Sequence, residues 1–135
     1  MSEAAARDTF KKRLHEVMPE SHCQRFEDRF HAGIPDMNVC LPEGVEWWVE
    51  AKHMKQLPVM KNTPVRVEIR KEQVLWLNNR KKVGGKCLVL VRIGLKEWVV
   101  FDDHFRQLEE GIVTERFFQL AKWRGDKLDI PAIFR

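Results

Sequence analysis

The chain has 135 residues, which favours a single domain with one sizeable core, and its 44% hydrophobic and 33% charged residues are typical of a globular protein rather than a disordered one. No apolar run approaches the roughly 20 residues needed to span a bilayer, and the charged start of the sequence lacks the apolar block of a secretory signal. The net charge is a modest +4, and three widely spaced cysteines argue against a disulfide framework and favour a reducing, cytoplasmic location.

The first predicted element is a helix over residues 4–18. Phe10, Leu14 and Val17 recur at helical spacing, and Pro19 closes the segment. A short strand is expected next, over residues 22–27.

Residues 34–41 and 45–52 predict a β-hairpin. The second of these segments is rich in Val and Trp, which favour strands, and Pro42-Glu43-Gly44 between the two is typical of a tight turn. The hairpin should therefore place the ends of its two strands side by side.

Residues 53–65 have little periodicity and predict an exposed, basic loop. A helix is then expected from about Arg66 or Glu68 to Val83, with Gly84-Gly85 as its C-terminal stop. One face of that helix would be lined by Ile69, Gln73, Trp76, Leu77 and Arg80.

Residues 87–93 form a nearly continuous apolar run, as expected of a central strand covered on both faces. Another strand should span residues 98–101. A short helix capped by Asp102 or Asp103 and running through Leu108 is expected after it.

Thr114 can cap a last helix, and the tail from Gly125 is expected to be loosely held. The predicted order is α-β-β-β-α-β-β-α-α, which indicates an α/β domain over residues 1–135 with a mixed sheet flanked by helices. Its core would cover about 4–101, with a C-terminal helical extension at about 102–135.

The residues that carry chemistry are Asp36, Glu50 and Lys52. In a strand, residues two apart share a face, so Glu50 and Lys52 point the same way while Val49 and Ala51 face the opposite, core side. A charged pair on one face of an otherwise apolar strand is costly to bury without partners. The alternative is an exposed hairpin with a surface ion pair of little energetic value.

Phosphodiester hydrolysis would account for this set. Two carboxylates, from Asp36 and Glu50, can hold Mg²⁺, which prefers oxygen ligands, and the backbone carbonyl of Ala51 could add another. Such a metal neutralises phosphate and makes a nucleophile of bound water at neutral pH. Lys52 would position that water or stabilise the developing charge. The sequence contains no G-x-S-x-G and no HExxH that would favour another chemistry.

Gly33-Ile34-Pro35-Asp36 followed by Glu50-Ala51-Lys52 resembles the signature of the PD-(D/E)XK nuclease superfamily. Within it the sequence is similar to VRR-NUC domains and to phage and archaeal Holliday-junction resolvases. The resemblance implies a restriction-endonuclease-like fold with an α-β-β-β-α-β core, which the predicted order matches over about residues 4–93.

The resemblance also implies roles for residues outside that signature. Gln73 fits a glutamine that these nucleases carry on the helix after the ExK strand, the alternative being a partly exposed amide. His22, Arg25 and Glu27 fit an H-x-x-R-x-E segment of phage members, which would make Glu27 catalytic rather than a plain surface acid. Related nucleases place a glutamate on the first helix, and here no candidate stands out among Glu3, Asp8 and Glu16.

Basic residues are concentrated in the sequence that follows Glu50-Ala51-Lys52. The segment from Lys52 to Lys86 has ten Lys or Arg and two acidic residues, a net charge of +8 where the whole chain carries +4. This block indicates a polyanionic partner, although a solvated lysine-rich face would have the same composition. The side chains assigned to DNA phosphates are Arg25, Lys55, Lys61, Arg66, Arg70 and Lys71.

Residues and resemblance together predict a Mg²⁺-dependent endodeoxyribonuclease, with Mn²⁺ as a substitute ion. By resemblance the substrate is branched DNA, the assembly is a homodimer, and the location is the cytoplasm, that of the host if the protein is phage-encoded. The alternatives are a nicking, restriction-like or single-strand nuclease of the same fold, and an inactive DNA-binding module.

Overall fold

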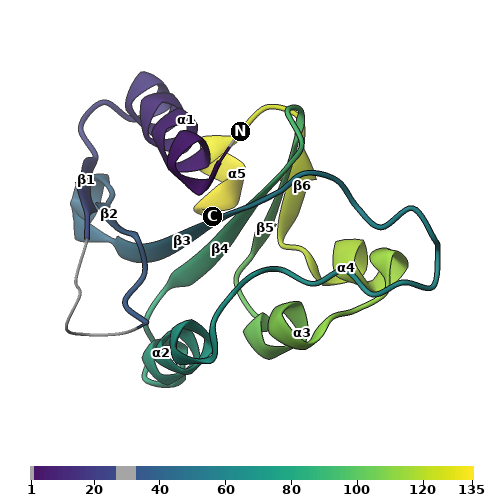
Figure 1. Ribbon diagram of the computed structural model, residues 1–135. Helices are drawn as coiled ribbons and strands as arrows, with labels where there is room; N and C mark the ends of the chain where they lie inside the picture. Colours follow the sequence, from purple (N-terminus) through teal and green to yellow (C-terminus); the bar gives the residue numbers. More distant parts are fainter. Residues whose placement is uncertain (1, 27–32) are drawn as a thin grey trace.

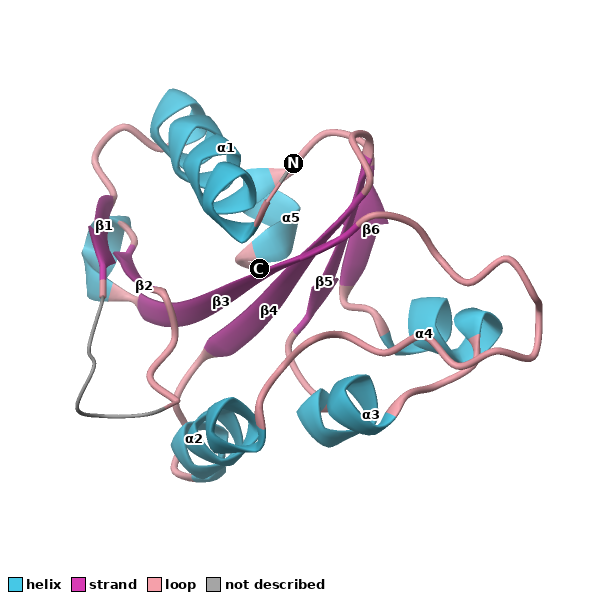
Figure 2. Cartoon of the chain, in the orientation of Figure 1, coloured by secondary structure: helices cyan, strands magenta, loops and turns pink. Residues whose placement is uncertain are grey.

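The described residues form a sheet of six strands in the order β1-β2-β3-β4-β5-β6, with helices on both of its faces (Figures 1 and 2). The computed structural model describes residues 2–26 and 33–135. The elements are α1 (Glu3–Val17), β1 (His22–Arg25), β2 (Met37–Cys40), the 3-10 turn η1 (Pro42–Gly44), β3 (Glu46–Met54), α2 (Lys71–Lys82), β4 (Cys87–Ile93), β5 (Glu97–Phe101), α3 (Phe105–Glu110), α4 (Thr114–Leu120), β6 (Trp123–Gly125) and α5 (Ile130–Ile133).

The sheet is mixed, as predicted. Strands β3 and β4 run parallel and are joined by the crossover through α2, whereas each of the other neighbouring pairs is antiparallel. The predicted hairpin is confirmed as β2-η1-β3, with Met37 opposite Val49 and Cys40 opposite Glu46. A parallel pair needs a crossover, and that requirement places the start of α2 near the end of β3.

Apolar side chains are buried on both sides of the sheet. On one side, Phe10 and Leu14 of α1 and Ile133 of α5 pack together against the sheet. On the other side, the core lies under α2, α3 and α4, and it includes Leu77 and Phe117. Figure 1 shows the same division, with α1 and α5 on one face and the other three helices opposite.

Strands β3 and β4 are buried on both faces, which confirms the prediction for residues 87–93. Leu90 of β4 faces the α1 side, and its neighbour Val91 faces the α2 side. In β3, Val49 and Ala51 lie in the α1-side core. Glu50 therefore lies on the opposite side, where it is paired in register with Val89 of the α2-side core.

Helix α2 begins later than predicted, at Lys71 rather than at Arg66 or Glu68. The preceding residues are extended instead, with Val65, Val67 and Ile69 buried and the residues between them exposed. Val65 forms a β-bridge with Ile112, and the N–H of Val67 donates to the carbonyl of Leu108, so the backbone of this stretch is paired across the fold and not along a helix.

The capping predictions for the two following helices were wrong. Helix α3 is preceded by His104, in a left-handed conformation with φ of 64°, and Asp103 instead accepts a hydrogen bond from the backbone N–H of His104. Helix α4 has Val113 as its N-cap, and Thr114 is its first helical residue.

The tail after Gly125 is not loosely held. Strand β6 pairs with β5 and completes the sheet, so residues 102–135 are not a purely helical extension. Leu128, Ile130 and Ile133 are almost completely buried against the core that also contains α1. No helix in residues 2–26 and 33–135 is long and apolar enough to cross a membrane.

Candidate active site

Strands β2 and β3 separate at Asp36, and the polar site lies at this fork. Strand β2 begins at Met37, which is opposite Val49, so the next residues of β3 have no partner on β2. The Asp36 side chain takes that place, because its Oδ2 accepts a hydrogen bond from the backbone N–H of Ala51 at 3.0 Å. The carboxylate of Asp36 is thereby fixed beside β3.

Gly33 brings the segment that carries Asp36 close to α2. Its φ of 94° lies in the left-handed region that favours glycine. A Cβ at this position would clash with the backbone carbonyl of Glu72, in the first turn of α2. The glycine of the G-I-P-D motif therefore serves the close approach between the Asp36 loop and the start of α2.

Glu50 is a buried carboxyl with an unpartnered oxygen. Its exposed fraction is 1%, and its Oε1 has no hydrogen-bond partner among the described residues. Burial, followed by the charge of Asp36 and a hydrogen bond with it, raises the pKa of Glu50 to about 9. The charge of Lys52 acts in the opposite direction. With its pKa of about 9 even beside Lys52, this carboxyl holds a proton at neutral pH when no metal ion is bound.

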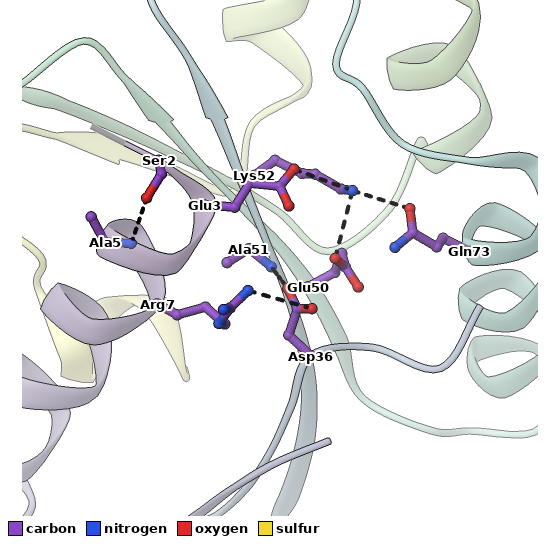
Figure 3. A network of polar contacts seen from close by, with 9 residues as sticks. All are labelled: Ser2, Glu3, Ala5, Arg7, Asp36, Glu50, Ala51, Lys52 and Gln73. Atoms are coloured by element: carbon purple, nitrogen blue, oxygen red, sulfur yellow. Dashed lines mark hydrogen bonds and ion pairs between the residues drawn. The ribbon is translucent and has the colours of Figure 1, made fainter. Parts of the chain in front are cut away.

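The Lys52 ammonium lies among three oxygen atoms from three elements (Figure 3). Its Nζ is 3.6 Å from Oε1 of Glu3, 3.7 Å from Oε2 of Glu50 and 3.1 Å from Oε1 of Gln73, to which it donates a hydrogen bond. The residue is 5% exposed. A lysine enclosed in this way keeps one orientation, because swinging out would leave buried carboxyl and amide oxygens unpaired.

Gln73 lies beside Lys52 and is buried, so it is not the partly exposed amide that was the alternative; its catalytic role stays a prediction. It is 6% exposed, and its Oε1 accepts a second hydrogen bond, from the backbone N–H of Arg70 at 2.9 Å. That second bond satisfies a donor at the start of α2. One amide oxygen thus joins the start of α2 to β3.

Helix α1 supplies two more side chains, Glu3 and Arg7. Glu3 pairs with Lys52, and Nη1 of Arg7 lies 3.9 Å from Oδ1 of Asp36 (Figure 3). The sequence left Glu3 as one of three acidic candidates and did not single out Arg7. The signal was their spacing, because residues four apart share one face of a helix. The face they share was recognisable only once α1 was placed over β3.

Asp36 and Glu50 are the residues that could hold a divalent cation. Their carboxyl groups are close enough to hydrogen-bond, and the unpartnered Oε1 of Glu50 needs a positive partner. In residues 2–26 and 33–135 no group of three or more His, Cys, Asp or Glu side chains gathers as a complete metal cage. This donor set fits an ion that keeps much of its own water, as Mg²⁺ does. The role of the Ala51 carbonyl stays a prediction.

The side chains assigned to DNA lie in three places. Arg25 is on β1, Lys55 and Lys61 are exposed in the loop between β3 and α2, and the remaining three lie at the start of α2 and just before it. This last group, Arg66, Arg70 and Lys71, lines one pocket together with the acidic Glu72, Glu109 and Glu110. The DNA-contact assignments stay predictions, and Glu27 lies outside the described residues.

The fold is similar to that of a solved archaeal structure. Hjc, a Holliday junction resolvase from Archaeoglobus fulgidus, matches with a TM-score of 0.55 and 16% identity over 85% of this chain and 93% of that one. A VRR_NUC domain matches with a TM-score of 0.48 and 24% identity over 68% of this chain and 83% of that one. No protein-family model and no curated protein sequence matches the chain. The similarity to Hjc confirms the predicted restriction-endonuclease-like fold.

Proposed function

We propose that this protein is a metal-dependent endodeoxyribonuclease that cuts branched DNA. The observation that carries the proposal is the pair of carboxyls at the β2–β3 fork, with Glu50 buried, Asp36 partly exposed and the Lys52 ammonium beside Glu50. Burying such a group without a ligand is costly, and a site of this kind in a shared nuclease fold favours catalysis over a structural role. The fold of Hjc supports the proposal.

Asp36 and Glu50 would hold the metal, which supplies charge neutralisation for the phosphate and a bound water of lowered pKa. Asp36 is oriented for this by the Ala51 N–H and by Arg7. The Glu50 carboxyl must lose its proton when it binds the cation. Its environment therefore makes metal affinity increase with pH up to its pKa of about 9.

Lys52 would act on the phosphate. Its ammonium is held within hydrogen-bonding distance of Gln73 and close to both Glu3 and Glu50. A preorganised cation stabilises the negative charge that develops on phosphate oxygens during cleavage, at no reorganisation cost. Glu3 and Gln73 hold Lys52 and are positioning residues.

For the assembly and the substrate, we propose a homodimer that cleaves a four-way junction. Hjc is described as a Holliday junction resolvase. Resolving such a junction needs two cuts in symmetry-related strands, and a two-fold dimer would present two identical sites to them. The part of the chain that the structure describes holds one candidate site, so two copies would be required.

The proposal is tested by cleavage of a four-way junction with Mg²⁺ or Mn²⁺, compared with linear duplex of the same sequence. We expect the junction to be cut preferentially, and Asp36→Asn, Glu50→Gln and Lys52→Met to lose cleavage by at least 10³-fold while still binding the junction. Matched controls are Glu46→Gln, an exposed acid on the same strand, and Lys96→Met, an exposed lysine between β4 and β5. Cleavage retained by Glu50→Gln would remove the proposal.

A second test separates an enzyme from a DNA-binding module with a spent site. Calorimetric titration with Mn²⁺ should show binding to the wild type that Asp36→Ala loses. Equal affinity in both proteins would favour the module. Preferential cleavage of nicked, flapped or linear DNA would support the nuclease activity but contradict the proposal that the substrate is a four-way junction.

A further inference from the structure

The loop between β3 and α2 ends in an exposed apolar tip. Val59 is 91% exposed and Met60 is 73% exposed, so almost the whole surface of both side chains is in contact with water. In Figure 1 the loop swings out past α4 and forms the outermost part of the molecule on that side. Adjacent apolar side chains that protrude in this way indicate a contact surface.

The base of the loop is fixed to the fold. Leu57 packs against the α2-side core, and Val65 is bridged to Ile112 by hydrogen bonds of 2.6 and 3.0 Å. Between these anchors the backbone N–H of Thr63 donates to the carbonyl of Met60 at 3.1 Å, which closes a turn at the tip. The tip is presented in a defined position, so binding there would cost little ordering entropy.

The loop's own charges suit a polyanion, with Glu115 of α4 beside it in a pocket shared with Lys61 and Asn62. No acidic residue occurs between Glu50 and Glu68, whereas Lys55, Lys61 and Arg66 lie in that stretch and are exposed. The same loop continues directly from β3, the strand that carries the candidate catalytic side chains.

We propose that Val59 and Met60 form a wedge that contacts unstacked bases at the branch point of the DNA. The inference rests on the proposed function and deepens it, because it names exposed bases as the feature that selects the substrate. Apolar side chains flanked by cations are the means by which proteins unstack base steps while neighbouring phosphates are neutralised. Contact with a second copy is disfavoured, because a two-fold contact at the tip would bring the lysines of both copies together.

The test measures binding in Ca²⁺ without cleavage, using a four-way junction and a linear duplex with 2-aminopurine at the branch or the equivalent position. The double variant Val59→Ser with Met60→Ser should bind the junction about tenfold more weakly than the wild type and the linear duplex equally well. It should also lose the fluorescence increase that reports unstacking at the branch. The matched control is Val83→Ser with Leu95→Ser, a pair that is 80% and 67% exposed elsewhere on the molecule.

Three outcomes would overturn the wedge. The first is unchanged junction binding by the Val59/Met60 variant, and the second is an equal loss on junction and duplex. The third is a change from dimer to monomer in sedimentation, which would assign the tip to self-association. Because binding is read separately from cleavage, a wild type that binds junctions through the tip but cuts no DNA would contradict the proposed function and not the wedge.

Discussion

The amide oxygen of Gln73 accepts hydrogen bonds from both Nζ of Lys52 and the backbone N–H of Arg70, at 3.1 and 2.9 Å. One side chain thus stabilises the start of α2 and orients the cation of the ExK strand. The two hydrogen bonds should have separable effects. Loss of the bond to Arg70 should lower stability, and loss of the bond to Lys52 should lower the proposed cleavage activity.

We expect Gln73→Met to lower the cleavage rate by about 10²-fold, because a misplaced catalytic group costs that much even when it is still present. Junction affinity should change little. The lost cap should reduce the free energy of unfolding by about 1 kcal/mol. Cleavage kinetics and urea unfolding measure the two effects. Gln73→Glu, which retains an acceptor for both donors, should lose less activity, and equal losses would contradict the positioning role.

Stability should fall with rising pH because of Glu50. The pKa of its carboxyl is raised from 4.5 to about 9, chiefly by burial and then by Asp36, so the folded protein holds a proton that the unfolded chain releases. Between those two pH values the free energy of unfolding should decrease by up to about 1.4 kcal/mol per pH unit. Glu50→Gln stays neutral and should remove that part of the slope. Urea unfolding in EDTA from pH 5.5 to 8.5 compares the two, and parallel slopes would contradict the raised pKa.

Arg7 should matter for catalysis although it lies outside the nuclease signature. Its guanidinium faces Asp36, its side chain is 13% exposed, and its Nε is buried without a hydrogen-bond partner among the described residues. Arg7→Met removes the charge that orients the carboxylate, and we expect about tenfold slower cleavage with little change in KM. Lys12→Met, an exposed position on the same helix, is the control. Equal rates in the two variants would show that Arg7 serves folding alone.

A methyl group at Gly33 should disturb the site from a distance. Gly33→Ala strains a positive φ and also forces the added Cβ against the Glu72 carbonyl, which should displace the start of α2. Gly44→Ala is the matched control, because it has a φ of 84° and no atom within 4 Å of the added Cβ. The control isolates the backbone strain, of order 1 kcal/mol. We expect thermal unfolding to show a larger loss for Gly33→Ala, accompanied by reduced cleavage.

The C-terminal helix α5 should contribute substantially to stability. Ile133 is fully buried in the core that contains α1. Ile133→Ala should therefore cost about 2–5 kcal/mol, and Ile133→Val about 0.5–1.5 kcal/mol. Urea unfolding measures both. A cost below 0.5 kcal/mol for the alanine variant would mean that the tail contributes little to the fold.

Local sequence patterns determined β4 and the strand β3, which carries Glu50 and Lys52. The apolar run 87–93 matches β4 residue for residue, because a strand covered on both faces has no polar side. The alternation along β3 separated Glu50 from Val49 and Ala51 before any fold was known. Asp36 was predicted beside this strand because a tight turn folds β2 back onto it.

Long-range packing decided the remaining features. Glu3 and Arg7 reach the site because α1 packs across β3, and nothing in the first seventeen residues specifies that partner. The start of α2 was decided by a bridge between Val65 and Ile112, which are distant in the chain, and the tail was ordered by its burial against α1. Short-range periodicity records which face of an element is apolar, but the element that covers this face is chosen by the free energy of burial over the whole chain.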